Sequence, residues 1–378
     1  MMNMDLTAEQ QAWKEKIRTF VEEKVIPVAK QYDQIGEFPQ PIIDEAAKIG
    51  LLRTVVPKEY GGPEIDALSY AILVEELGRG CSAVATTING NGLSSYPVLI
   101  GGNSQQKEKW FKYLLDDKMA SFALTEPAAG SDAGAVQTTA VLDGDEYIIN
   151  GSKCFITTGG HASVFAVIAT TDRTKKIKGL SAFIVEADRE GISIGKHENK
   201  MGLCSSNTVE VLFRNVRIPK ENLIGKEGDG FRLAMKTLDV GRINQASMAV
   251  GLSQYALEAV IDFVKTQQKG GKPLSKSQYF QFKVADIALA VEAARNMVQK
   301  ACYLRDSGKP YSKEAAMTKT FCTDTAMKVA SEAVDVLGIY GYMKESPVEK
   351  LMRDVKVMQI YEGTNQIQRI VIANNMLA

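Results

Sequence analysis

The stretch Glu146-Tyr-Ile-Ile-Asn-Gly-Ser-Lys-Cys-Phe-Ile-Thr-Thr-Gly159 indicates the fold class, because it is β-rich and stands between two long helical zones. Asn150-Gly151 between apolar runs is a strong signal for the turn of a β-hairpin. Further β-rich runs cover residues 164–170, 180–185 and 208–218. Several short strands at this spacing predict a small antiparallel barrel or sandwich.

Helical patterns flank this zone on both sides. Thr7 and Gln10 fit a capping box at the start of a first helix, and further helices are predicted near 41–50, 68–77 and 107–115. After residue 226 long helical patterns cover 231–265, 278–305, 313–337 and 348–354. The 378 residues therefore predict an α+β chain of three domains. They are a helical domain (1–118), a β domain (119–230) and a C-terminal four-helix-bundle domain (231–378).

Composition excludes several classes of protein. Lys+Arg and Asp+Glu number 45 each, so the basic excess typical of nucleic-acid binders is missing. No apolar run reaches the ~18 residues that a membrane span needs. Five cysteines without CxxC spacing and two histidines favour neither a disulfide framework nor a metal site. The segment MMNMDLTAEQQ lacks the pattern of a signal or transit peptide, so we expect a cytoplasmic protein.

Two segments of the β zone carry groups suited to binding. In Phe122-Ala-Leu-Thr-Glu-Pro-Ala-Ala-Gly-Ser-Asp132, a strand runs into two turns whose backbone N–H groups and hydroxyls suit the polar edge of a ring. In Asn150–Gly159 the predicted second strand presents an aromatic side chain and a hydroxyl. An ordinary loop and plain β-structure are the alternative interpretations of these two segments.

Two helical segments are also candidates. Leu238-Asp-Val-Gly-Arg-Ile243 places Asp239 and Arg242 three residues apart, a spacing typical of a local ion pair. Tyr361-Glu-Gly-Thr-Asn-Gln-Ile-Gln-Arg369 sets an acid between an aromatic residue and a glycine, and Thr364 suits the start of a new helix. A loop carboxylate in such a setting is a candidate catalytic base, and a simple helix–helix connection is the alternative.

The combination of TEPxxGSD, NGxKxxIT and YEGTNQIQR, in the order helical, β, helical, resembles the acyl-CoA dehydrogenase family over nearly the whole chain. Within that family the sequence looks like the short-chain (butyryl-CoA) branch. The resemblance implies FAD bound between the β domain and the C-terminal bundle. It assigns the flavin and its ribityl–pyrophosphate region to Phe122, Leu124, Thr125, Gly130, Ser131, Phe155, Thr157, Thr364 and Gln366.

The resemblance also implies the chemistry. Glu362 matches the family base that removes the α-proton of an acyl thioester, while the β-hydride goes to the flavin and a trans-2-enoyl thioester forms. We expect desolvation to raise the pKa of Glu362 toward working pH. The substrate site would include Ser131, Leu238, Asp239, Arg242, Tyr361 and Gly363. An electron-transfer flavoprotein would take the electrons.

The sequence departs from the family pattern in two places, both implied to hold the ADP half of FAD from a neighbouring subunit. Gln267, Lys269 and Gly270 stand where relatives have Arg, Gln and Phe, and Asp335-Val-Leu-Gly338-Ile339 replaces Gln-x-x-Gly-Gly. Losing a bidentate Arg removes a phosphate fork, so we expect weaker FAD retention. A Lys269–Asp335 pair across the interface is an alternative.

The neutral stretch Thr86–Leu93 favours a short, uncharged acyl group, and Asn89 or Asn91 would suit a hydroxyl on it. We expect a homo-oligomer, a tetramer rather than a dimer. Three alternatives to acyl-CoA oxidation remain open. They are a dehydrogenase for acyl groups tethered to a carrier protein, the same chemistry run as an enoyl-CoA reductase, and a non-catalytic scaffold that has lost FAD.

Overall fold

The computed structural model describes residues 5–377 and begins with a group of helices. Thr7 caps the first helix, and the Thr7–Gln10 capping box predicted from the sequence is present. The helices of this part, in chain order, are α1 (Ala8–Phe20), the π-helical η1 (Val21–Val25), α2 (Ile26–Ile35), α3 (Gln40–Lys48), the short η2 (Leu51–Arg53) and η3 (Lys58–Tyr60), α4 (Ala67–Gly80), α5 (Ser82–Gly101) and α6 (Ser104–Leu115).

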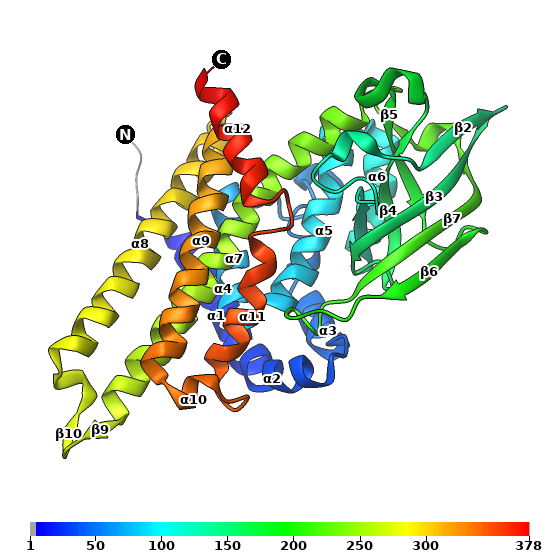
Figure 1. Ribbon diagram of the computed structural model, residues 1–378. Helices are drawn as coiled ribbons and strands as arrows, with labels where there is room; N and C mark the ends of the chain where they lie inside the picture. Colours follow the sequence, from blue (N-terminus) through cyan, green and yellow to red (C-terminus); the bar gives the residue numbers. More distant parts are fainter. Residues whose placement is uncertain (1–4, 378) are drawn as a thin grey trace.

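Helix α5 is absent from the sequence prediction. Its sequence holds three glycines and Pro97, which indicate a loop. Most residues of α5 are nevertheless buried, because α4, α7 (Gly230–Thr266) and β1 (Met119–Ala123) pack against it. A helix that is buried on most of its surface has little amphipathic pattern, so hydrophobic periodicity could not reveal it. Figure 1 shows α5 between the helical part of the chain and the sheet.

The middle of the chain forms one open, eight-stranded mixed sheet, and not the closed barrel that was one of the two predicted alternatives. Its strand order is β6-β7-β3-β2-β4-β5-β8, with β1 pairing in parallel to β4. The strands are β1 (Met119–Ala123), β2 (Thr139–Asp143), β3 (Glu146–Thr157), β4 (Ala162–Thr170), β5 (Leu180–Glu186), β6 (Ile192–His197), β7 (Thr208–Pro219) and β8 (Leu223–Ile224). The short helices η4 (Ala133–Ala135), η5 (Arg173–Gly179) and η6 (Lys220–Asn222) connect them.

Asn150-Gly151 does not form the predicted hairpin turn. Strand β3 runs straight through it, and the pairing of β3 with β7 shifts register there. The Asn150 Oδ1 accepts the backbone N–H of Asn215 at 2.8 Å, so the asparagine stabilises an irregular strand pair instead of a turn. The hairpin turn lies a few residues earlier, at Gly144-Asp145, because Asp143 pairs with Glu146.

Both faces of β4 are buried, which explains why its sequence is continuously apolar. Phe165, Val167 and Ala169 pack with the apolar side chains of β3, β5 and β7. Val164, Ala166 and Ile168 point the other way, into a core shared with α6 and the start of α7 (Gly230–Thr266). The sheet is thereby fixed to the long helix that forms the opposite wall of the site.

The last part of the chain is helical. After α7 it contains a small hairpin, β9 (Gln268–Lys269) and β10 (Lys272–Pro273), then η7 (Leu274–Lys276), α8 (Gln278–Asp306), α9 (Ser312–Leu337), α10 (Ile339–Tyr342), α11 (Pro347–Met358) and α12 (Asn365–Leu377). Apolar side chains of α1 and α4 share one continuous core with α7, α8, α9 and α11. Among residues 5–377 there is no helix long and apolar enough to span a bilayer.

Candidate active site

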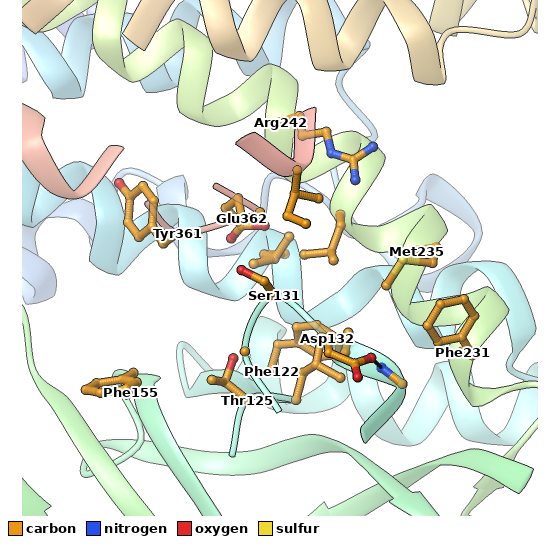
Figure 2. A pocket seen from close by; sticks show the side chains of 18 of the residues that line it. Phe122, Thr125, Ser131, Asp132, Phe155, Phe231, Met235, Arg242, Tyr361 and Glu362 are labelled. Carbon is orange, nitrogen blue, oxygen red and sulfur yellow. Dashed lines mark hydrogen bonds between the residues drawn. The ribbon is translucent and has the colours of Figure 1, made fainter. Parts of the chain in front are cut away.

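A cleft of about 310 Å³ opens where the sheet, helix α7 and the connection between α11 and α12 meet (Figure 2). Most of the candidate residues inferred from the sequence line it, although they come from distant parts of the chain. They are Phe122, Leu124, Thr125, Gly130, Ser131, Phe155, Thr157, Leu238, Arg242, Tyr361, Glu362 and Gly363. The order of elements thus brings four separate motifs to one place.

The loop that carries Glu362 is held in an unusual backbone conformation. Glu362 and Gly363 both have positive φ, at +55° and +83°, which a glutamate rarely adopts without support. The Gln368 side chain provides that support, because its Nε2 donates to the carbonyls of Glu362 (3.1 Å) and Gly363 (2.9 Å). Thr364 caps α12, as predicted, by accepting the N–H of Ile367 at 3.2 Å.

The Glu362 side chain is partly buried, and one oxygen of its carboxylate has no hydrogen-bond partner among the described residues. Its Oε2 atom is buried and accepts no hydrogen bond from the residues that the structure describes. Gly241 on α7 makes room for it, since a Cβ at Gly241 would lie 2.5 Å from that oxygen. Burial raises the pKa of Glu362 from 4.5 to about 7, although Lys319 and Arg242 oppose the rise. This is the direction expected from the sequence.

Arg242 both lines the cleft and forms the local ion pair that its spacing from Asp239 indicates. The arginine is buried, with 4% of its surface exposed, and its Nη1 donates to Asp239. Asp239 also accepts the Ser312 hydroxyl at 2.8 Å and does not line the cleft. Asp239 therefore orients Arg242, and only the arginine reaches the cavity wall.

A buried ion pair holds the opposite wall. Lys153 Nζ lies 2.7 Å from Glu126 Oε1 and donates to the Leu124 carbonyl at 3.0 Å. Burial acts to raise the pKa of Glu126, but Lys153 and hydrogen bonds around Gln137 and Thr138 bring it below its usual value. Burial lowers the pKa of Lys153 to about 8. The Glu of TEPxxGSD and the Lys of NGxKxxIT thus fix the turn that presents Leu124 and Thr125.

Phe155 is the most unusual part of this wall. It has φ +57°, and 60% of its surface is exposed although it is a large aromatic side chain. It sits on β3 beside Thr157, across the cleft from α7 (Figure 2). An exposed aromatic ring at the edge of a cleft is suited to packing against a flat ligand.

Five candidate residues lie far from this cleft. Gln267 and Lys269 are exposed at the β9–β10 hairpin, and Asp335, Gly338 and Ile339 are exposed at the end of α9, at the remote tip of the helices (Figure 1). Gln366 is exposed on α12, and Thr364 uses its hydroxyl as a helix cap. Within one chain these seven residues do not line the cavity.

The sequence prediction was wrong about Asn89 and Asn91 as recognition groups for a hydroxyl. Asn89 is buried and accepts hydrogen bonds from Tyr70 (3.2 Å) and Asn244 (2.9 Å). Asn91 accepts the backbone N–H of Ala120 at 3.0 Å, where it joins α5 to β1. Both amides are therefore occupied in joining elements.

Several lining residues were missed. Phe231 and Met235 precede Leu238 and Arg242 on one face of α7, so a stripe at helical spacing was available as a signal. Gly90 and Leu93 belong to the stretch Thr86–Leu93 that the sequence analysis associated with the acyl group, although the helix that carries them was not predicted. The lining residues not singled out from the sequence are Asp132, Ala133, Gly134, Ile156, Ile177, Phe231, Met235 and Ile367.

Comparison with known proteins shows which family the chain is similar to over its whole length. Family models for the N-terminal, middle and C-terminal domains of acyl-CoA dehydrogenases match residues 7–118, 121–216 and 228–377. A short-chain specific acyl-CoA dehydrogenase of Clostridium acetobutylicum is 43% identical over 99% of this chain and 100% of its own. Butyryl-CoA dehydrogenase from Megasphaera elsdenii superimposes with a TM-score of 0.97 at 41% identity, covering 100% of both chains.

Two further solved structures concern cofactors and electron transfer. A chain in a structure described as an electron transferring flavoprotein of Acidaminococcus fermentans has 43% identity and a TM-score of 0.97, with 100% of both chains covered. The FAD complex of PigA has 27% identity and a TM-score of 0.93, with 99% of both chains covered. Acyl-CoA dehydrogenases depend on FAD. By its three matched domains and its full-length relatives, this chain belongs to the acyl-CoA dehydrogenase family.

Proposed function

We propose that this protein is an FAD-dependent dehydrogenase that converts a short-chain acyl-CoA into the trans-2-enoyl-CoA. The observation that carries the proposal is the Glu362 carboxylate at one wall of the cleft, whose Oε2 atom is buried and accepts no hydrogen bond from the described residues. A carboxylate with a pKa near 7 suits abstraction of a weakly acidic α-proton at neutral pH. Full-length relatives named for butyryl-CoA and short-chain substrates support the substrate class.

The cleft fits a flavin on the sheet side. Phe155 offers an exposed ring, and a Cβ at Gly130 would meet no atom within 4 Å, so the wall is open there. Phe122, Leu124, Thr125, Ser131 and Thr157 would hold the ring system together with these two residues. The proposed FAD supplies an acceptor for the β-hydrogen, which the substrate loses as a hydride.

Glu362 performs the proton chemistry in this proposal. With its carboxylate ionised, it takes the α-proton of the thioester and becomes a neutral acid, while a carbon–carbon double bond replaces the two lost hydrogens. The backbone N–H of Glu362 makes no backbone hydrogen bond within residues 5–377 and is available to the thioester oxygen as negative charge develops on it. Gly363, next in the chain, lets the backbone approach closely.

The acyl end of the cleft supports a short, uncharged group. We assign Gly90, Leu93 and Tyr361, which line the cleft, to the acyl end, and none of them carries a charge at neutral pH. Burial raises the pKa of Tyr361 well above its usual value, so its hydroxyl stays neutral. A charged acyl tail would lose its hydration there without gaining a partner.

Electrons leave to an electron-transfer flavoprotein in this proposal, supported by the relative in the Acidaminococcus fermentans structure. We also propose a homotetramer, in which Gln267, Lys269, Asp335, Gly338 and Ile339 contact FAD of a neighbouring subunit. Their exposure at the tip of the helices leaves them accessible to another chain. Sedimentation of a monomer at micromolar concentration would exclude this assembly.

The visible spectrum tests the whole proposal. The purified protein should show a flavin spectrum with about one FAD per chain, and anaerobic butyryl-CoA should bleach it within the mixing time of a cuvette experiment. Longer acyl-CoAs, glutaryl-CoA and a butyryl group on a carrier protein serve as comparison substrates. A colourless protein that does not take up added FAD would reject the proposal, and faster bleaching by the carrier-bound thioester would change the substrate.

A further inference from the structure

Lys319 is a buried cation at the back of the base loop. It lies on α9, is 0% exposed, and is among the largest fully buried side chains of residues 5–377. Its Nζ donates to the Gly363 carbonyl at 2.8 Å and to Asn365 Oδ1 at 2.8 Å. Burying an amine is costly unless nearby groups compensate for its lost hydration, so its location requires an explanation.

The two acceptors of Lys319 belong to Gly363, which directly follows Glu362, and to Asn365, two residues further along the chain. Asn365 is itself fixed, because its Nδ2 donates to Thr323 (2.9 Å) and Asp324 (2.8 Å). The Gly363 carbonyl receives a second hydrogen bond from Gln368 at 2.9 Å. Lys319 therefore joins α9 to the positive-φ segment of the loop and to the first residue of α12.

The charges around Lys319 make Glu362 its electrostatic partner. Ionisable groups that act on Lys319 are Glu362 from the loop, Arg242 from α7 and Asp324 from its own helix. Asp324 is already engaged with Gln359 at 2.7 Å and with Arg369 at 3.0 Å. Burial lowers the pKa of Lys319 to about 7, with Glu362 opposing that change. Glu362 thus favours the protonated form of the amine, and the protonated amine favours the ionised form of the Glu362 carboxyl.

We propose that Lys319 is a positioning residue for the catalytic step, holding the Glu362–Gly363 backbone in place and keeping the Glu362 carboxylate ionised by its positive charge. This inference rests on the proposed role of Glu362 as the base. Arg242 is the second cation that faces Glu362, but it is neutralised by Asp239. Lys319, in contrast, forms no ion pair with a carboxylate within the described chain.

The test compares Lys319→Met and Lys319→Gln with the unmodified holoenzyme. Glutamine retains a donor for the Gly363 carbonyl but no charge. Flavin reduction by butyryl-CoA, followed by anaerobic stopped flow, should slow at least about tenfold in Lys319→Met with little change in substrate binding. In both variants the rise of the rate with pH should move up by about one pH unit or more, because removing a cation makes Glu362 harder to ionise.

A readout that needs no turnover is the infrared carboxyl band that disappears in Glu362→Gln. In the substrate-free holoenzyme this band should persist to higher pH in the Lys319 variants. Lys350 provides a matched control, since it is a buried lysine paired with Asp354 on α11. Lys350→Met should lower the melting temperature without moving the pH profile or the infrared titration.

Unchanged pH profiles and infrared titrations in Lys319→Met and Lys319→Gln would overturn the inference. So would a loss of FAD content, melting temperature and rate in proportion, or failure of both variants to fold, because the amine would then serve only the fold. If no acyl thioester reduces the unmodified protein, the proposed function fails, and the infrared titration still decides whether Lys319 controls Glu362.

Discussion

Glu362→Gln separates the chemistry of the base from its shape, because glutamine keeps the side-chain volume and loses the basic oxygen. The rate of flavin reduction by butyryl-CoA should fall by ~10²–10⁴, the usual contribution of a positioned base. Binding of FAD and of the thioester should remain, since neither depends on the charge of this group. Stopped-flow absorbance under anaerobic conditions measures the rate directly.

The same substitution has a stability effect that can be worked from the structure. The carboxyl of Glu362 has a pKa of about 7 in the folded protein, against 4.5 as its ordinary value. At a pH below 4.5 the Glu362 carboxyl is protonated in both the folded and the unfolded chain, so its ionisation does not lower the free energy of unfolding. As pH rises through the range up to about 7, the unfolded chain releases its proton first, so wild-type stability falls by up to about 3 kcal/mol.

The assay is therefore the free energy of unfolding by denaturant, measured for the wild type and for Glu362→Gln near pH 5 and near pH 8. Glutamine does not titrate, so the advantage of Glu362→Gln over the wild type should be small at the lower pH and up to about 3 kcal/mol at the higher one. Glu190→Gln, at an exposed position, is the control and should show no such difference. An equal effect at both pH values, or reduction at close to the wild-type rate, would refute the reasoning.

Three further perturbations test the surroundings of the base and the cofactor. Gly241→Ala should displace the Glu362 carboxylate, which lies 2.5 Å from the new Cβ position, and should slow flavin reduction while FAD content stays constant; an unchanged rate would contradict this. Lys153→Met should lower the free energy of unfolding by about 3–5 kcal/mol, because it leaves Glu126 buried and unpaired; a loss below about 1 kcal/mol would show that the site relaxes. Gln267→Arg should slow the loss of FAD during long dialysis, whereas tight retention by the wild type would count against the expected weak contact.

The regular parts of the fold were predictable from local patterns. The capping box at Thr7, the helices α3, α4, α6 and α7, and strands such as β4 each have a sequence signal that depends on neighbouring residues only. Helix α5 and the irregular strand pair at Asn150 were not predictable in this way. Their conformations are set by tertiary contacts, which override propensity.

In the site, too, some features follow from the local sequence and others depend on tertiary contacts. The motif around Glu362 indicates a base, but the space that accepts its carboxylate comes from Gly241, which is more than a hundred residues away. Lys319 gives no signal either, because a lysine within a helical pattern is normally an exposed residue. Only the packing of α9 against the loop shows that its amine ends at the Gly363 carbonyl.

The core shared by α1 and α4 with α7, α8, α9 and α11 has a consequence for how the chain is made. On the ribosome, the first helices emerge well before the partners that cover them, with the whole sheet synthesised in between. At ~5–20 residues per second this delay lasts many seconds, during which their apolar faces remain accessible to chaperones. The sheet has an apolar core of its own and can be completed meanwhile. Truncated chains that end before α7 should therefore aggregate, and Glu362 can reach the cleft only after the sheet and helices α7 to α11 have been synthesised.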